Sequence, residues 1–229
     1  MNSIKVIAFD ADDTLWVNEP FFRETEANFC ELVADILPKE QAARTLLDIE
    51  LKNLPLYGYG VKGFTLSLIE ALGVLTKGKA SFALVEKTIK LGQAILHKPV
   101  EVLDGVETLL KKLNGDYRLV MATKGDLLDQ ERKLIRSGLE QYFHHIEVMS
   151  DKQVSDYHKL LKHLDCRPQE FLMVGNSLKS DILPVLELGA WAVHVPFHTT
   201  WEHEMVEVNI KNSKFYEATN ISEILNILS

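Results

Sequence analysis

Ile4-Lys5-Val6-Ile7-Ala8-Phe9 leads directly into Asp10-Ala11-Asp12-Asp13-Thr14-Leu15, so an apolar, β-prone run stops at three carboxylates within four positions. Such a run is typical of a strand buried in a parallel sheet. In open α/β folds the active site lies at the carboxyl ends of the strands. The beginning of the chain therefore predicts a buried strand that carries acidic side chains to a functional edge of a sheet.

The spacing of the first two acids indicates a metal site. Asp10 and Asp12 would share one face of a strand, where like charges repel unless a positive group lies between them. A divalent cation is the simplest neutraliser, and hard oxygen ligands suit Mg²⁺, which is commonly shared with phosphate oxygens. One carboxylate could then attack phosphorus while the other handles the proton of the leaving group. The alternative is an acidic turn in which Asp13 or Thr14 caps the next helix.

The composition narrows the class of protein. The chain has 229 residues, 46% of them hydrophobic, which is ordinary for a globular protein with one large or two small domains. Its net charge is -8 and its basic residues are scattered, which argues against a nucleic-acid partner. Cys30 and Cys166 fit a reducing compartment. The first apolar run is too short for a signal peptide or a membrane span, so we expect a cytoplasmic protein without a membrane partner.

The periodicity of the chain predicts two kinds of structure. Helical patterns cover about 21–37, 39–52, 64–72 and 82–96, with a glycine- and aromatic-rich segment at 53–63. From residue 99 onward, expected strands at 117–122, 145–149, 171–174 and 191–195 alternate with helices at 105–113, 126–137, 157–164, 182–188 and 221–228. This alternation predicts an α/β fold, a Rossmann-like, doubly wound parallel sheet with helices on both faces. We expect a core of residues 1–15 and 99–229 and an inserted all-helical domain over 16–98.

Asp10-Ala11-Asp12-Asp13-Thr14 after a hydrophobic strand resembles the DxDxT signature of the haloacid dehalogenase-like superfamily of phosphatases and phosphotransferases. The remaining motifs of that superfamily are matched, in order and each after an expected strand, by Thr123, by Lys152 and by Gly175-Asn176-Ser177-Leu178-Lys179-Ser180-Asp181. Two positions depart from the pattern. Gln153 follows Lys152 where the family often has proline, which leaves Lys159 as an alternative, and position 176 carries an amide rather than an acid.

The resemblance implies a chemistry for these residues. Asp10 would be the nucleophile that forms an aspartyl phosphate, and Asp12 would be the general acid and then the general base. Thr123 and Lys152 would balance charge on the transferring phosphoryl group. The implied ligands of Mg²⁺ are Asp10, the main-chain carbonyl of Asp12, Asp181 and Asn176, the last two directly or through water.

The resemblance also implies a role for the helical insert, as a C1-type cap that excludes water and selects a small phosphorylated metabolite. Tyr57, Tyr59 and Lys62 are the candidate substrate-binding residues in this insert, with Thr123 and Lys124 at the phosphate. The alternative is that the aromatic residues only pack a turn. Neither the substrate nor the oligomeric state follows from the sequence.

Other functions fit parts of the same pattern. A phosphomutase would pass the phosphoryl group to a sugar hydroxyl instead of water. A haloacid dehalogenase needs neither a metal nor a leaving-group acid, so Asp12 argues against it. A phosphoacceptor or binding module of the receiver type would lack the helical insert. A zinc site is not expected, because the histidines at 144, 145, 158, 163, 194, 198 and 203 form no HExxH or Cys/His motif and fall on several elements.

Overall fold

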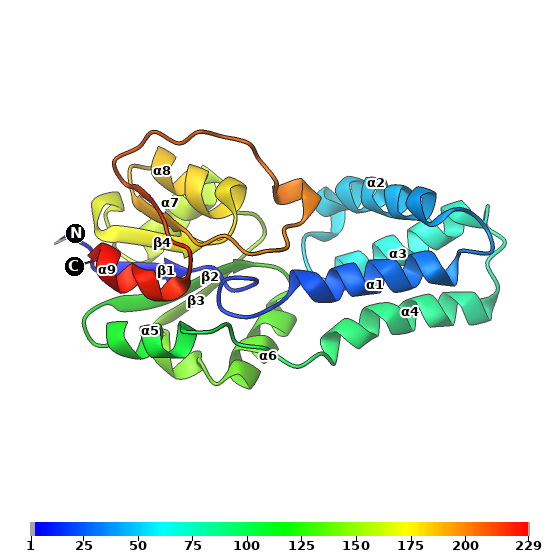
Figure 1. Cartoon of the computed structure of the whole chain (residues 1–229), viewed down its shortest axis with the longest axis horizontal. Coiled ribbons are helices and arrows are strands. Elements are labelled where there is room, and N and C mark those ends of the chain that lie inside the picture. Colours follow the sequence, from blue (N-terminus) through cyan, green and yellow to red (C-terminus); the bar gives the residue numbers. More distant parts are fainter. Residues whose placement is uncertain (1–2, 229) are drawn as a thin grey trace. The chain divides into compact units, whose positions relative to one another are not determined.

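The computed structural model describes residues 3–228. Its strands are β1 Val6–Phe9, β2 Arg118–Lys124, β3 His145–Met149, β4 Phe171–Gly175, β5 Trp191–His194 and β6 Phe215–Glu217. They form one parallel sheet in the order β3-β2-β1-β4-β5-β6 (Figure 1). The predicted fold class is confirmed, and every expected strand is present. The strand β6 was not predicted, because three residues are too few to show an alternating pattern.

The sheet is buried on both faces, as its apolar strands predict. On the central strand β1, Ile7 and Phe9 belong to one core cluster, while Val6 and Ala8 belong to a second. Successive side chains of a strand point to opposite faces, so the two clusters are the two sides of the sheet. A sheet covered in this way positions its strand ends rigidly, and these ends carry the candidate site.

Helices cover both faces. The helices outside the insert are α5 Val106–Leu113, α6 Leu127–Ser137, α7 Val154–His163, α8 Leu183–Glu187 and α9 Ile224–Leu228, with short turns η1 Glu140–Tyr142, η2 Pro168–Glu170, η3 Leu178–Ile182, η4 Glu202–Glu204 and η5 Ile221–Glu223. Leu109, Leu134 and Ile224 place α5, α6 and α9 against the face of Ile7. Tyr157 and Val185 place α7 and α8 against the opposite face (Figure 1). The sheet is therefore doubly wound.

The chain divides into two compact units. The sheet unit comprises the residues up to 19, residues 100–124 and those from 131 on, and the helical unit comprises residues 20–99 and 125–130. The sequence division at 16–98 differs from this mainly in the turn after β2, which groups with the helices. Sequence periodicity cannot show this, because residues 125–130 are far from residues 20–99 in the sequence and contact them only in the folded chain.

The helical unit contains α1 Glu19–Leu32, α2 Lys39–Tyr57, α3 Val61–Leu75 and α4 Phe82–Leu96. Its core includes Phe29, Leu46 and Leu68 from the first three helices. Several expected helix ends differ by three residues or more, as at both ends of α3, and two differ by five. The first helix stops at Leu32 instead of residue 37, and α2 continues through Pro55 instead of ending at residue 52. Pro55 removes one N–H donor, but the N–H of Gly58 still bonds to the carbonyl of Leu54, so α2 continues to Tyr57.

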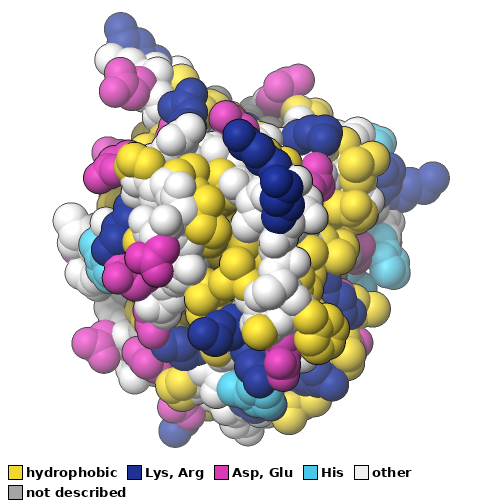
Figure 2. All heavy atoms as spheres, turned by 90° about the vertical axis from the view of Figure 1, so that its right-hand side faces the viewer, with side chains coloured by type: hydrophobic (Ala, Val, Ile, Leu, Met, Phe, Trp, Pro, Cys, Tyr) yellow, Lys and Arg dark blue, Asp and Glu magenta, His cyan; other side chains and the backbone are white. Residues whose placement is uncertain are grey.

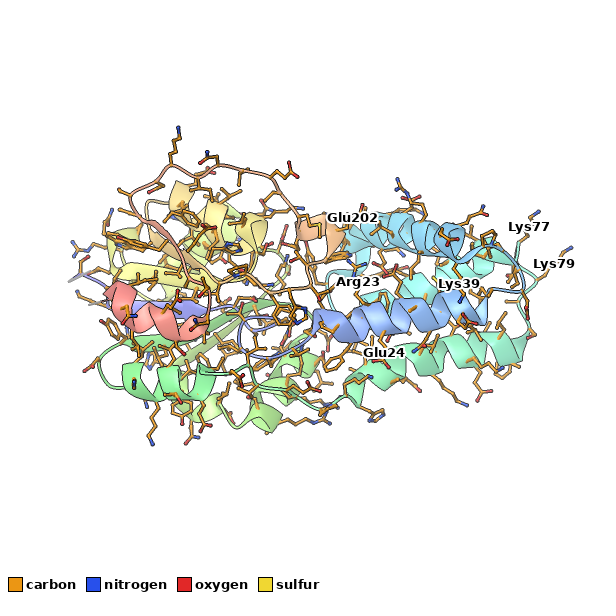
Figure 3. All side chains as sticks on the ribbon, in the orientation of Figure 1. Arg23, Glu24, Lys39, Lys77, Lys79 and Glu202 are labelled. Atoms are coloured by element: carbon orange, nitrogen blue, oxygen red, sulfur yellow. The ribbon has the colours of Figure 1, made fainter. Side chains whose placement is uncertain are left out.

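Charged side chains cover much of the helical unit. The carboxylate of Glu24 on α1 pairs with Lys98, and Lys39 at the start of α2 pairs with Glu31; Figure 3 labels Glu24 and Lys39. Apolar side chains lie between charged ones on the face shown in Figure 2, and Phe82 is 83% exposed. Within residues 3–228 no helix is long and apolar enough to cross a membrane.

Candidate active site

The register of the sheet brings the predicted site residues to one edge. Phe9 of β1 pairs with Met121 of β2 and with Val174 of β4, so the residues that follow these positions lie at neighbouring strand ends. The N–H of Asp10 donates to the carbonyl of Val174 at 2.9 Å, which fixes Asp10 beside the end of β4. Thr123, also at a strand end, is buried, and its hydroxyl donates to the main-chain oxygen of Lys124 at 3.1 Å.

Lys152 joins two carboxylates at the centre of the site. Its ammonium group donates to Oδ1 of Asp10 and, at 2.6 Å, to Oδ1 of Asp181. Only 1% of the Lys152 side chain is exposed. The structure places Lys152 here and not the alternative Lys159, whose side chain is exposed on α7 and pairs with Asp156. A lysine in this position can neutralise a carboxylate and hold an anionic substrate group.

Burial and charge act in opposite directions on this cluster. Burial raises the pKa of Asp10, the ammonium of Lys152 lowers it, and the carboxylate of Asp181 raises it again, with a net rise to about 7. Burial would lower the pKa of Lys152, but the two carboxylates raise it above its ordinary value. With both carboxylates ionised, the three groups carry a net negative charge that a bound cation would balance.

Asp12 has partners of its own, apart from Lys152. Its Oδ1 accepts from the indole N–H of Trp16 at 2.8 Å and from Nζ of Lys133 on α6 at 2.6 Å. Lys133 also donates to the side-chain oxygen of Asn18 at 3.2 Å. The two carboxylates that share a sequence motif are thus paired with two different lysines. Sequence reasoning missed Lys133, because a lysine within a helix ordinarily lies on a solvated face.

The remaining two polar residues of the motif, Asp13 and Thr14, have separate structural roles. The carboxylate of Asp13 accepts from the N–H groups of Asn18, at 2.8 Å, and Glu19, at 3.0 Å, and so caps the start of α1. Asp13 therefore has the capping role that the acidic-turn alternative gave to Asp13 or Thr14, while Asp10 and Asp12 each contact a lysine. The hydroxyl of Thr14 lies 3.3 Å from Oδ2 of Asp10 and 3.2 Å from Oδ1 of Asn176. Thr14 therefore links the ends of β1 and β4.

The segment after β4 shapes the position of Asp181. Residues Leu178–Ile182 form a π-helical turn, a geometry that recurs at functional sites. Oδ2 of Asp181 accepts from the N–H of Ser177 at 3.0 Å. A Cβ on Gly175 would lie 2.2 Å from that same Oδ2, so only glycine leaves room for this carboxylate. Tyr157 supports the turn from α7 by donating its hydroxyl to the carbonyl of Ser180 at 3.0 Å.

Glu204 is a mostly buried acid, with 12% of its side chain exposed, that sequence reasoning missed. Its Oε2 accepts from the hydroxyls of Ser177 and Ser180, both at 2.6 Å, and its Oε1 accepts from Nζ of Lys124 at 2.6 Å. Burial alone would raise the pKa of Glu204, but Lys124 and the two hydroxyls lower it to about 2. Lys124, a candidate phosphate ligand, is thus engaged by Glu204 and, at 2.9 Å, by Ser180. The segment around Glu204 has no periodicity that could have indicated this contact.

The other substrate-binding candidates belong to the helical unit. Tyr57 ends α2 and is 49% exposed, and Tyr59 is partly buried in the connection to α3. Lys62 donates to Oδ2 of Asp126 at 2.9 Å, a contact within the helical unit. A Cβ on Gly60 would lie 2.8 Å from the backbone nitrogen of Asp126, so Gly60 permits the close approach of these two segments.

The donor set of the site fits Mg²⁺. The carboxylates of Asp10 and Asp181 and the amide oxygen of Asn176 are hard oxygen ligands, linked to one another through Lys152 and Thr14. Two carboxylates against one ammonium leave a negative charge, and His194 contacts Asn176 at its main-chain oxygen, at 3.0 Å, and not at its amide oxygen. This chemistry suits a hard cation.

Comparison with known proteins identifies relatives of the whole chain. The model of the haloacid dehalogenase-like hydrolases matches residues 4–189. The crystal structure of a haloacid dehalogenase-like family hydrolase from Xanthomonas campestris is 35% identical, covers 99% of this chain and 91% of its own, and superposes with a TM-score of 0.89. Glyceraldehyde 3-phosphate phosphatase of Methanothermobacter thermautotrophicus is 26% identical over 90% of this chain and 92% of that protein. The enzyme of the same name from Pyrococcus furiosus is 25% identical over 100% of this chain and 94% of its own length.

Proposed function

The chain belongs to the haloacid dehalogenase-like hydrolases, and we propose that it is a Mg²⁺-dependent phosphatase that acts through an aspartyl-phosphate intermediate. The family membership inferred from the DxDxT resemblance is confirmed. The observation that carries the proposal is the placement of Lys152 between Asp10 and Asp181, with Asp12 held separately by Lys133. We propose that the acid beside Lys152 is the nucleophile and that the acid positioned by Lys133 and Trp16 carries the proton.

In the proposed reaction, a carboxylate oxygen of Asp10 attacks the phosphorus of the substrate in line. The bond from phosphorus to the ester oxygen breaks, and Asp12 gives its proton to the departing alkoxide. Asp12 then takes a proton from the water that attacks the aspartyl phosphate, which releases phosphate and restores Asp10. Lys152 and Thr123 stabilise the negative charge that develops on the phosphoryl oxygens.

The residues that would hold Mg²⁺ are Asp10, Asp181 and Asn176, together with the main-chain carbonyl of Asp12. When bound, the ion supplies positive charge that balances the phosphate oxygens in the transition state. A haloacid dehalogenase needs no acid for its leaving group, so a separately positioned Asp12 favours phosphate ester hydrolysis.

The substrate we propose is a small phosphorylated sugar. Two relatives that align with nearly the whole chain are named glyceraldehyde 3-phosphate phosphatase, which makes this ester the first to assay. We propose that the helical unit acts as the cap, with Tyr57, Tyr59 and Lys62 as the residues that select the substrate. The exposure of Tyr57 and Lys62 and the place of all three at the junction of α2 and α3 support this role.

The experiment measures phosphate release from an aryl phosphate and from glyceraldehyde 3-phosphate, with and without Mg²⁺, for the wild type and Asp10→Asn. We expect turnover that requires Mg²⁺ and is lost in the variant. Acid quenching during turnover of a substrate labelled at phosphorus should trap a labelled protein in the wild type only. The matched control is Asp116→Asn, which changes an exposed acid that precedes β2, at the opposite end of this strand from Thr123.

Each alternative function predicts a different result, measured in parallel with phosphate release. A sugar phosphate isomer formed without release of inorganic phosphate would favour the phosphomutase. Halide release from a 2-haloacid in the absence of metal would favour the dehalogenase. Labelled protein that forms without turnover would favour the phosphoacceptor module. Any of these results would overturn the phosphatase proposal.

A further inference from the structure

Two histidines and a glutamate lie together at the edge of the sheet. His145 and Glu147 are two residues apart on the edge strand β3 and therefore point to the same face. Met149, two residues further, packs in the core cluster that contains α7, so this is the face that α7 covers. His163 is the last residue of α7. The fold thus brings β3 and the end of α7 together at these three side chains.

The geometry of the three side chains is that of a small ligand cluster. Oε2 of Glu147 lies 2.9 Å from Nε2 of His145 and 3.7 Å from Nδ1 of His163. The two imidazole rings meet edge to face with centroids 4.8 Å apart. One ligand atom from each residue lies within 4.8 Å of the others. Ligands of a tetrahedral zinc ion are about 3.4 Å apart, so small side-chain rotations would close the cluster around an ion.

We propose that His145, Glu147 and His163 bind a divalent transition-metal ion, of which Zn²⁺ is the best match. Two imidazoles and one carboxylate are a donor set for zinc and its neighbours in the series, whereas Mg²⁺ prefers oxygen alone. The His163 side chain is 65% exposed, so an ion can enter from water and keep a water molecule as its fourth ligand. This site is distinct from the oxygen-rich group around Asp10, because strand β2 lies between β3 and β1.

The position of the cluster indicates what a bound ion would do. The ligands lie on β3 and on the last turn of α7, and the segment that joins these two elements carries Lys152. An ion would therefore connect β3 and α7, the two elements that flank Lys152. It would also hold α7 against β3, an edge strand that has a neighbouring strand on one side only. No spacing in the sequence predicts this cluster, because its members come from a strand and from the end of the next helix.

The test uses Zn²⁺ itself. Protein stripped with EDTA is dialysed against Zn²⁺ in the presence of excess Mg²⁺, which occupies the oxygen-rich site, and bound zinc is measured by elemental analysis. The variants are His163→Asn and Glu147→Gln, and the matched control is His158→Asn, an exposed histidine on the same helix. We expect about one equivalent of Zn²⁺ in the wild type and the control. Affinity should fall at least about tenfold in the other two, because even a residue that only hydrogen-bonds to a ligand is worth roughly 10- to 100-fold.

A second readout does not depend on the variants. Co²⁺ bound to the stripped wild type should show the visible absorption of a tetrahedral site, and Zn²⁺ should abolish it and raise the melting temperature. Equal zinc binding by His163→Asn and His158→Asn would overturn the proposal. So would the absence of zinc binding and of the cobalt spectrum in the wild type, which would leave Glu147 as an ion-pair partner of the histidines. None of these measurements depends on phosphatase activity.

Discussion

Nζ of Lys133 lies 2.6 Å from Oδ1 of Asp12, while Lys152 contacts Asp10, so each carboxylate of the pair has a lysine of its own. The mutual repulsion expected from their spacing is therefore reduced before any metal binds. The indole of Trp16 provides a second donor to Asp12 and fixes its direction. If Asp12 carries the proton in the reaction, Lys133 is the residue that positions it.

Replacement of Lys133 should slow the chemical step. In Lys133→Met the carboxylate of Asp12 loses the ammonium donor at 2.6 Å, so its orientation toward the leaving group is less defined. We expect kcat to fall by about tenfold to a hundredfold, which is less than the loss of a complete general acid. The measurement is steady-state hydrolysis of an aryl phosphate.

The control for this prediction is Arg132→Met, which changes the adjacent, exposed residue of α6. It should leave kcat unchanged. An unaltered kcat in Lys133→Met would show that Asp12 is positioned without Lys133 and would contradict the proposed role. A change in the apparent affinity for Mg²⁺ without a change in kcat would contradict the proposed role of Lys133.

Gly175→Ala should disable the site without unfolding the protein. The new Cβ would lie 2.2 Å from Oδ2 of Asp181, so this carboxylate must move. A displacement of about 1 Å can cost roughly a hundredfold in rate, and we expect a loss of Mg²⁺-dependent turnover of at least this size. Gly73→Ala is the matched control, because nothing lies within 4 Å of its added Cβ. Full activity in Gly175→Ala would mean that Asp181 is not needed where the structure places it.

Lys152→Met should destabilise the metal-free protein. Removal of the ammonium leaves Asp10 and Asp181 as buried carboxylates without a cation, and breaking a buried pair in this way costs about 3–5 kcal/mol. Urea denaturation would measure the free energy of unfolding, and Mg²⁺ should restore part of it because the ion replaces the lost charge. Lys159→Met, which changes an exposed lysine of α7, should be neutral. Equal stability of the two variants would contradict the pairing of Lys152 with both carboxylates.

The sequence predicted the sheet because each strand is a short apolar run, and a buried parallel strand produces that pattern directly. It predicted Asp10, Thr123, Lys152 and Asp181 because polar residues that end such strands gather at one edge. It could not predict Lys133 or Glu204. Lys133 lies 121 residues from its partner Asp12, and Glu204 ends the three-residue turn η4, so neither contact produces a periodic sequence pattern. Side-chain contacts between residues far apart in the sequence are determined by tertiary packing and not by the local sequence pattern.

Glu204 makes stability depend on pH in the acidic range. Burial opposes its charge, but Lys124 and the hydroxyls of Ser177 and Ser180 lower the pKa from 4.5 to about 2. A depressed pKa in the folded state contributes stability that is present above pH 4.5 and is lost as the pH falls toward about 2. The shift corresponds to about 3 kcal/mol near neutral pH.

Glu204→Gln should therefore lower the free energy of unfolding by roughly this amount, about 3 kcal/mol, at neutral pH. The difference between wild type and variant should shrink as the pH falls below 4.5, because the wild-type carboxylate then loses its advantage. Urea titrations at several pH values measure this difference. Glu202→Gln, an exposed acid at the start of the same turn, is the matched control and should follow the wild type (Figure 3). A difference that stays constant with pH would mean that the Glu204 contacts stabilise the protein by packing alone, since a charge-based contribution must vanish once the carboxyl group is protonated in both states.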